Sequence, residues 1–155
     1  MHRIIATYVR RRRALTVSLG TSLALFFTLF SLLQLIAFEK LPPIVSSVWG
    51  FTDSELGAVV AALVVTAQVL GIPYLLNMQL SAAMRVVSAV AAFAAAGYWF
   101  WLGLYTSMEL VLVSNSGLGG VYASIPGGSW LLWFGLGMTL LVGWYSYGLI
   151  LESRE

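Results

Sequence analysis

Four long apolar segments, separated by shorter polar ones, form the main pattern along this chain. They cover about Ala14 to Phe38, Leu56 to Leu76, Val86 to Ser107 and Ser129 to Leu151. Each holds the roughly 20 mostly apolar residues that an α-helix needs to cross about 30 Å of hydrocarbon. The pattern predicts an all-α membrane protein, a single domain over residues 1–155 built as an antiparallel bundle of four transmembrane helices. An outer loop at 108–128 would join the third helix to the fourth.

Composition agrees with a chain that lies mostly in a bilayer. Of its 155 residues, 60% are hydrophobic and only 9% are charged, and the mean hydropathy is +0.92. Water-soluble domains carry about 25% charged residues. Little of the chain is left over for a soluble domain.

The charged residues divide unevenly between the two sides of the predicted membrane. If the four spans alternate in direction, seven of the eight basic residues fall on one side: Arg3, Arg10, Arg11, Arg12, Arg13, Arg85 and Arg154. Lys40 falls on the other side with most of the acids, which are Glu39, Asp53, Glu55 and Glu109. Cytoplasmic loops of membrane proteins are enriched in Lys and Arg. We therefore expect a multi-pass membrane protein with both termini in the cytoplasm.

The arginine run from Arg10 to Arg13 directly precedes the first span, and Arg85 opens the third. Four consecutive arginines create a strong positive potential, which would also suit a nucleic-acid patch. Because the run abuts the membrane, we interpret it and Arg85 as residues that set topology and contact anionic lipid headgroups. Membrane lipids are therefore predicted partners, and nucleic acid is not.

Small residues recur at intervals of four in every predicted span. The sets are Gly20, Ala24 and Thr28; Gly57 and Ala61, with Ala58, Ala62 and Thr66; Ser88, Ala92 and Ala96; and Gly135, Thr139 and Gly143. Small side chains at this spacing share one helix face and let two backbones approach closely. They predict a compact bundle. Aromatic residues near the span ends are expected to act as interfacial anchors or as packing.

The first outer connection, from Glu39 to Ser54, begins within the sequence FEKLPPI. We expect Pro42 and Pro43 to end the first span, because proline in a helix interior removes a hydrogen bond and clashes with the preceding turn. At the far end of this connection, Thr52 or Ser54 should cap the second span.

The inner connection NMQLSAAMR is short, which predicts an antiparallel hairpin of the second and third spans. The second outer connection is longer. Its apolar residues cluster in two strand-like pieces, Glu109 to Val113 and Val121 to Ser124, on either side of SNSGLGG. Such a sequence indicates turn chemistry between two short strands. We expect a short β-hairpin over the outer mouth of the bundle.

A few polar residues lie inside or at the edge of the predicted hydrocarbon. Gln34 lies about one turn before the end of the first span, Gln68 lies near the middle of the second, and Glu39 with Lys40 forms an acid–base pair at the boundary. A buried glutamine usually hydrogen-bonds to a neighbouring helix. These four residues are candidates for lining a binding pocket.

Pro73 interrupts the backbone hydrogen bonding of the second span and frees a carbonyl one turn earlier, near Val69. We expect a kink there, with Gln68 or Thr66 helping to satisfy the exposed backbone.

The sequence contains no cysteine and a single histidine, His2, which precedes the first span. Thiolate chemistry, thiolate metal sites and paired haem imidazoles are therefore excluded. No nucleotide-binding motif, zinc spacing or Ser/His/Asp set is present. We predict no catalytic residues, no metal site and no cofactor, and a self-contained enzyme is disfavoured.

Part of the chain resembles the DoxX and MauE superfamily of small four-helix bacterial membrane proteins. The resemblance covers roughly Phe30 to Tyr105 and is carried by IAFEKL, by Gln68 in VVTAQVLGIPYLL, and by Arg85 in SAAMRVVSAV. Many members have a carboxylate where Gln68 stands, and this chain lacks the cysteine that a thiol relay of the MauE type would need. The resemblance implies an accessory role near redox or envelope machinery.

Three functions are compatible with these features. The leading hypothesis is a small integral-membrane accessory subunit or assembly factor of a larger complex in the bacterial inner membrane, which recognises other membrane or envelope proteins through its outer loops and lipid-facing helices. The first alternative is a DoxX-like redox-associated protein that binds a quinone or lipid near Glu39, Lys40 and Gln68. The second alternative is a small-solute channel or carrier, which the absence of intramembrane carboxylates and lysines weakens.

Overall fold

The structure, a computed structural model, describes the backbone of residues 2–36, 38–108, 115–120 and 125–152, and the side chains of 14–36, 38–53, 55–108, 115–120 and 125–150. Its regular elements are all helical: α1 (His2–Ile36), the 3-10 helix η1 (Phe38–Lys40), α2 (Leu41–Trp49), α3 (Ser54–Leu75), α4 (Ala82–Met108) and α5 (Ser129–Glu152).

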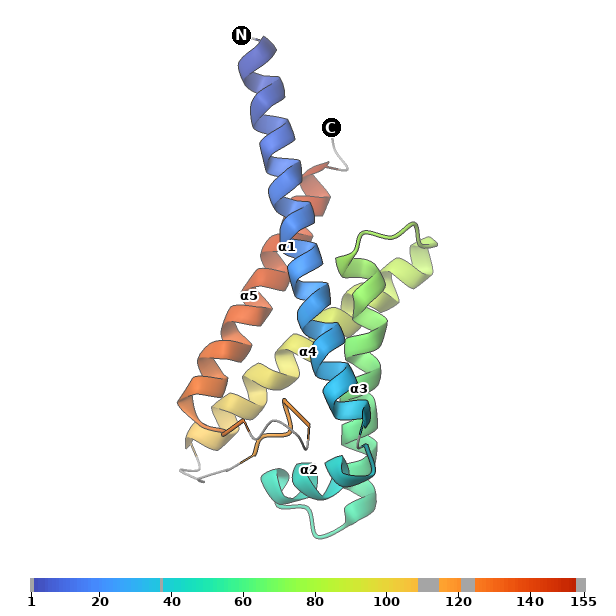
Figure 1. Cartoon of the computed structure of the whole chain (residues 1–155), viewed down its shortest axis with the longest axis vertical. Coiled ribbons are helices and arrows are strands. Elements are labelled where there is room, and N and C mark those ends of the chain that lie inside the picture. Colours follow the sequence, from blue (N-terminus) through green and yellow to red (C-terminus); the bar gives the residue numbers. More distant parts are fainter. Residues whose placement is uncertain (1, 37, 109–114, 121–124, 153–155) are drawn as a thin grey trace.

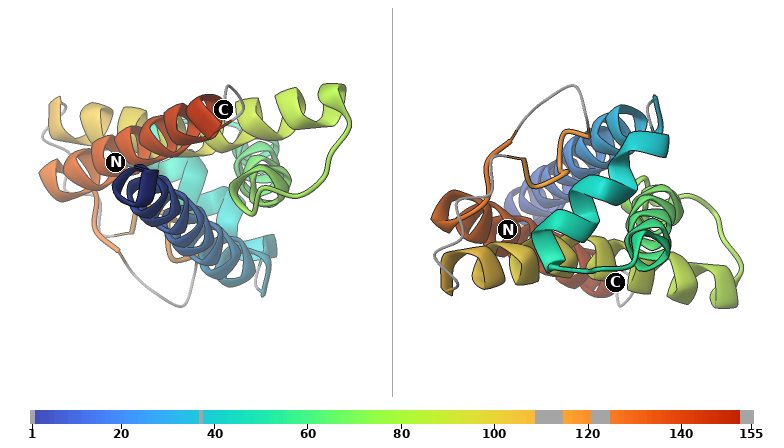
Figure 2. Two further views of the ribbon diagram at one scale, coloured as in Figure 1. Left: turned by 90° about the horizontal axis from the view of Figure 1, so that it is seen from above. Right: turned by 90° about the horizontal axis from the view of Figure 1, so that it is seen from below.

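The four long helices run alternately in opposite directions, so the start of α1 and the end of α5 lie at the same end (Figure 1). We call this end the inner end and the opposite end, where α2 lies, the outer end. Helix α1 packs on α3 and α5, and α4 packs on the same two helices, with its most extensive contact to α5. Views along the bundle show the short α2 crossing the outer end (Figure 2).

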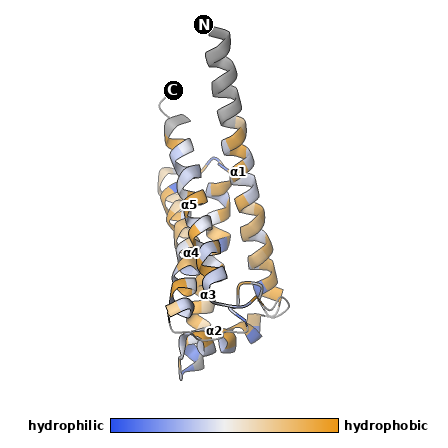
Figure 3. Cartoon of the chain, turned by 90° about the vertical axis from the view of Figure 1, so that its left-hand side faces the viewer, coloured by the Kyte–Doolittle hydropathy of each residue, from blue (hydrophilic) through white to orange (hydrophobic). Residues whose placement is uncertain are grey.

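Three helices are long and apolar enough to cross a membrane, in the segments Ala14–Ile36, Glu55–Leu75 and Ala82–Met108. They correspond to the first three predicted spans. Helix α5 has a similar length of 24 residues, and in the part of the chain that the structure describes it is not one of these three. Apolar residues cover much of the described length of α1, whereas polar residues gather near α2 (Figure 3).

Glycines produce the closest helix contacts. A Cβ on Gly103 in α4 would collide with the backbone of Leu132 in α5, and one on Gly135 in α5 would collide with the backbone of Phe100. A Cβ on Gly20 would likewise collide with the carbonyl of Leu75. Because glycine has no side chain, the backbones of α5 and α4 come into direct contact at these positions, as do those of α1 and α3.

The predicted small-residue faces are correct in part. Ser88, Ala92 and Ala96 are all buried, as predicted. By contrast, Ala62 and Thr66 are exposed, so the prediction for that face of α3 is wrong. The other predicted pair, Gly57 and Ala61, is buried. A Cβ on Gly57 would collide with Pro42 and Ser46 of α2, an element that the sequence pattern did not reveal.

Pro42 and Pro43 do not simply end the first span. Helix α1 ends at Ile36, and the two prolines lie in the first turn of α2. Proline is well suited to that position because the first backbone N–H groups of a helix have no partner within it. Gly50 ends α2 in the left-handed conformation, with φ of 66°. The prolines therefore turn the chain and start a new helix across the bundle end.

Asp53 caps α3, which corrects the predicted role of Thr52 or Ser54. Its side chain accepts a hydrogen bond from the backbone N–H of Glu55 at 2.8 Å. A carboxylate at this position satisfies a free N–H group and also lies at the positive end of the helix dipole.

Ser88 of α4 forms hydrogen bonds with two backbone groups of α3 next to Pro73. Its hydroxyl accepts from the N–H of Tyr74 at 3.0 Å and donates to the carbonyl of Leu70. These two backbone groups are the pair that bond to each other in a regular helix. The predicted contribution of Gln68 or Thr66 is not observed, since the serine comes from the neighbouring helix instead.

Candidate functional site

A short loop closes the outer end of the bundle. Residues 115–120, which we call the plug loop, are buried from Ser116 onwards. The side chain of Gln34 in α1 donates to the carbonyls of Gly117 at 3.2 Å and Leu118 at 3.1 Å. A Cβ on Gly120 would collide with the carbonyl of Leu33, so the loop backbone lies directly on α1.

Local hydrogen bonds hold the plug loop in its turn. The side chain of Asn115 accepts from the N–H of Gly117 at 3.0 Å and donates to the carbonyl of Gly120 at 3.2 Å. Both glycines have positive φ, 80° and 64°, a conformation that glycine adopts without strain. Ser116 donates to the carbonyl of Ile125 through both its N–H, at 2.7 Å, and its hydroxyl, at 2.9 Å. The predicted turn chemistry of SNSGLGG is thus present, but it is packed into the bundle.

Leu118 at the tip of the plug loop is fully buried. It belongs to a hydrophobic cluster with buried residues from α2, α3, α4 and α5, namely Val48, Val64, Trp99, Leu102 and Leu131. The two strand-like pieces predicted on either side of the turn, 109–113 and 121–124, lie outside the described residues. What the structure describes of this connection is therefore a buried closure of the outer mouth.

Gln68 lies in the apolar middle of the bundle. The contact of Gly20 with Leu75 sets the antiparallel register of α1 and α3 and places Gln68 at about the level of Phe27. The side chain is only 1% exposed, yet neither its amide nitrogen nor its amide oxygen has a hydrogen-bond partner among the described residues. An unpaired buried amide costs about 1–3 kcal/mol for each group left unsatisfied. The predicted hydrogen bond to a neighbouring helix is therefore not observed for either glutamine: Gln34 donates to the plug loop, and Gln68 has no partner among the described residues.

The four candidate pocket residues are not brought together. Glu39 and Lys40 are exposed at the outer end, and Gln34 is buried beneath the plug loop. In the same register Gln34 lies opposite Ala61, which is seven residues, or about 10 Å along the axis, from Gln68. The arrangement offers two separate features: an exposed charged rim and a deeply buried amide.

An aromatic cluster joins α2 to α4 at the outer end. The ring of Trp49 stacks on Tyr105 with centroids 5.1 Å apart, and its indole nitrogen donates to the hydroxyl of Tyr98 at 3.4 Å. The sequence placed Trp49 in a loop, so its role in fixing α2 was missed. Pro42 and Pro43, followed by an apolar run, were the signal that could have indicated a helix in this segment, because proline is common in the first turn of a helix.

No group of three or more potential metal ligands occurs among the described residues. No protein-family model, curated protein or solved structure matches the chain. The resemblance to the DoxX and MauE superfamily therefore stays a prediction. The fold itself defines a helical, multi-pass type of membrane protein with a closed outer end.

Proposed function

We propose that α5 is a fourth membrane span and that both termini face the cytoplasm of a bacterial cell. Four exposed aromatic residues of α5 support this topology: Trp130 and Trp133 near its outer end, and Trp144 and Tyr147 near its inner end. The two pairs are 14 residues apart, which corresponds to about 21 Å along a helix. Trp and Tyr favour the two membrane interfaces, so this spacing suits a helix that crosses the bilayer.

We further propose that the protein is a small accessory subunit or assembly factor of a larger inner-membrane complex. The observation that supports this role most directly is the closure of the outer end by the buried plug loop. All the charged side chains described at the outer end are exposed: Glu39, Lys40, Asp53 and Glu55. An exposed charged surface of this kind is sufficient for the recognition of a partner protein.

The chemistry of this rim suggests the kind of partner. Three of its four charges are negative, and they lie around α2 and the start of α3. Complementary charge guides association and selects among partners. The partner surface is therefore expected to be basic and to lie on the outer side of the membrane, with apolar helix faces meeting within the bilayer.

Purification in a mild detergent at native expression tests the subunit role. The wild-type chain should co-purify with a stoichiometric partner, and the double variant Glu39→Lys, Glu55→Lys should lose most of it. Glu152→Lys with Glu155→Lys provides the matched control, because it makes the same charge change in the C-terminal segment of the sequence. Recovery of a monomer with nothing bound would rule the proposal out.

Reporter fusions test the topology separately. Fusions after residue 155 and before residue 1 should both report a cytoplasmic location, while an insertion after Ser47, which is exposed in α2, should report the opposite side. Termini on opposite sides of the membrane would exclude a fourth crossing.

A second candidate function is binding of a quinone or lipid, and the unpaired amide of Gln68 is the observation that favours it. A carbonyl or hydroxyl of a ligand would satisfy the amide that the described residues leave unpaired. Solvent extraction of the purified protein followed by mass spectrometry would identify such a ligand. Gln68→Ala should then lower its occupancy, whereas the rim variants should not.

A further inference from the structure

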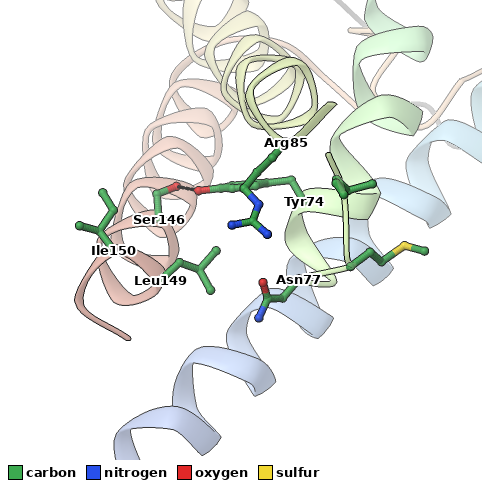
Figure 4. A pocket seen from close by; sticks show the side chains of 8 residues that line it. Tyr74, Asn77, Arg85, Ser146, Leu149 and Ile150 are labelled. Atoms are coloured by element: carbon green, nitrogen blue, oxygen red, sulfur yellow. Dashed lines mark hydrogen bonds between the residues drawn. The ribbon is translucent and has the colours of Figure 1, made fainter. Parts of the chain in front are cut away.

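A cavity of about 370 Å³ opens at the inner end of the bundle, between the end of α3, the start of α4 and the end of α5. Its lining includes Tyr74, Asn77, Arg85, Ser146, Leu149 and Ile150 (Figure 4). This volume falls in the range of about 300–1,000 Å³ that small-molecule sites occupy. We call it the inner cavity.

The inner cavity lies at the depth of lipid headgroups. Helix α4 has 27 residues, so it is about 40 Å long and exceeds the roughly 30 Å of hydrocarbon. Arg85 lies in its first turn, and the cavity surrounds that turn. The end of α1 that carries the arginine run Arg10 to Arg13 extends beyond the other helices on this same side (Figure 1).

The positive charge of Arg85 in the cavity is not neutralised by the protein as described. Among side chains that the structure describes, Arg85 is the only charged one at the inner end, and the described acids Glu39, Asp53 and Glu55 all lie at the outer end. Figure 4 shows the guanidinium of Arg85 and the amide of Asn77 pointing into the same space. A guanidinium binds phosphate oxygens through two parallel hydrogen bonds.

Asn77 is held in place by the helix end on which it lies. It follows the last turn of α3 with φ of 50°, and its N–H donates to the carbonyl of Tyr74 at 3.0 Å. The next N–H, of Met78, donates to the carbonyl of Pro73 at 3.0 Å. Together these bonds form a Schellman motif, in which asparagine tolerates the left-handed position. The backbone of Asn77 is therefore fixed, and its side chain lines the same cavity as Arg85.

The hydroxyl pair in the cavity supplies acceptors. Tyr74 donates to the hydroxyl oxygen of Ser146 at 2.7 Å, and Ser146 donates to the carbonyl of Val142 at 2.8 Å. Both hydroxyl protons are thus already used, and only oxygen lone pairs are left for a ligand. The cavity combines a cationic donor side with a neutral acceptor side, and apolar side chains such as Leu149 line its remaining wall.

We propose that the inner cavity binds the headgroup of an anionic phospholipid that carries hydroxyl groups, as phosphatidylglycerol does. The phosphodiester would contact Arg85 and Asn77, the headgroup hydroxyls would donate to Tyr74 and Ser146, and the acyl chains would continue along the apolar helix faces. Basic pockets between transmembrane helices on the cytoplasmic side are a recognised way of binding anionic headgroups. This site requires the inner end to face an anionic leaflet and is independent of the proposed subunit role.

Native mass spectrometry of the full-length protein in neutral detergent, with equal amounts of phosphatidylglycerol and phosphatidylcholine added, tests the site. Wild type should prefer phosphatidylglycerol, and Arg85→Gln should lower that preference about tenfold or more, the effect expected from losing a hydrogen bond to a charged group. Arg12→Gln removes the same charge at the same end and should lower it much less. Equal loss in both variants, or no loss in Arg85→Gln, would overturn the proposal.

Asn77→Asp gives an independent check. Aspartate also tolerates the left-handed conformation, and the substitution adds a negative charge to the cavity with almost no change of shape. It should reduce phosphatidylglycerol binding at least as much as Arg85→Gln, and unchanged binding would contradict the site.

Soluble anions distinguish a lipid site from a phosphate site. Inorganic phosphate and glycerol 3-phosphate, each added at millimolar concentration, should fail to displace phosphatidylglycerol, because neither has the acyl chains that the apolar wall contacts. Displacement by either compound would show that the cavity binds a soluble phosphate, and the lipid assignment would fail.

Discussion

The side-chain amide of Gln34 donates a hydrogen bond to the backbone carbonyl of Leu118, 84 residues further along the chain, at 3.1 Å. This bond joins the first long helix to the plug loop, and a second bond from the same nitrogen reaches Gly117 at 3.2 Å. Both carbonyls belong to buried residues. A polar residue that the sequence placed within the hydrocarbon thus serves to bind a loop rather than another helix.

Gln34→Met should release the plug loop. The substitution keeps most of the side-chain volume but leaves two buried carbonyls without this donor, which should destabilise the fold by about 1–3 kcal/mol. Thermal unfolding in detergent, followed by tryptophan fluorescence, measures the change. Because the chain has no native cysteine, Ser116→Cys adds a single reporter thiol. Its labelling by a maleimide should be slow in the wild-type background and faster with Gln34→Met, and equal rates would contradict the anchoring role.

Gln68→Met should have the opposite effect on stability. Neither polar atom of Gln68 has a partner among the described residues, so an apolar side chain of similar volume removes an unfavourable burial and should stabilise the isolated protein by about 1–2 kcal/mol. The same unfolding measurement applies, with Gln34→Met as the matched comparison. A clear loss of stability would show that the amide has a bound partner in the functional state.

Ser88→Ala should weaken the pairing of α3 with α4. The serine hydroxyl bridges the N–H of Tyr74 and the carbonyl of Leu70 beside Pro73, so its removal leaves backbone groups unsatisfied and should cost about 1–3 kcal/mol. Ser22→Ala is the control, because Ser22 is exposed and bonds only within its own helix, to the carbonyl of Ser18. Its effect on the unfolding midpoint should be small. Similar losses in the two variants would argue against the bridge.

Gly103→Ala should separate α4 from α5. The added methyl group would collide with the backbone of Leu132. The two helices would have to move apart to relieve this collision, and overpacking of this kind costs about 1–3 kcal/mol. Gly97→Ala lies in the same helix and meets open space, so it should raise stability by up to about 1 kcal/mol. Unfolding midpoints that move in opposite directions would confirm the difference, and parallel shifts would contradict it.

Several features could be predicted from the sequence because they depend on hydrocarbon and on local geometry. The length of an apolar run decides whether a helix can cross the membrane, and three such helices are present. The small residues Ser88, Ala92 and Ala96 share one face by helical spacing alone, and all three are buried. The turn character of SNSGLGG follows from glycine, which accepts positive φ, and from asparagine, whose side chain bonds to nearby backbone groups.

Other features depend on which element happens to lie opposite. Helix α2 was not predicted because two prolines are compatible with either the end of one helix or the start of another. Which of the two occurs depends on whether the following residues find a surface to pack against. The exposure of Ala62 and Thr66 has the same origin, since α3 turns a different face toward α2 and the bundle.

The sequence by itself determined that this chain is a helical membrane protein, that its basic residues gather at one end, and that two glutamines enter the apolar region. Only the tertiary structure decided that Gln34 pairs with Leu118 while Gln68 has no partner among the described residues, and that Arg85 faces a cavity with Asn77. The physical reason is that helix formation and membrane partition depend on neighbours within a few residues. Hydrogen-bond partners and cavities depend on the register between helices, which is set by close backbone contacts such as that of Gly20 with Leu75.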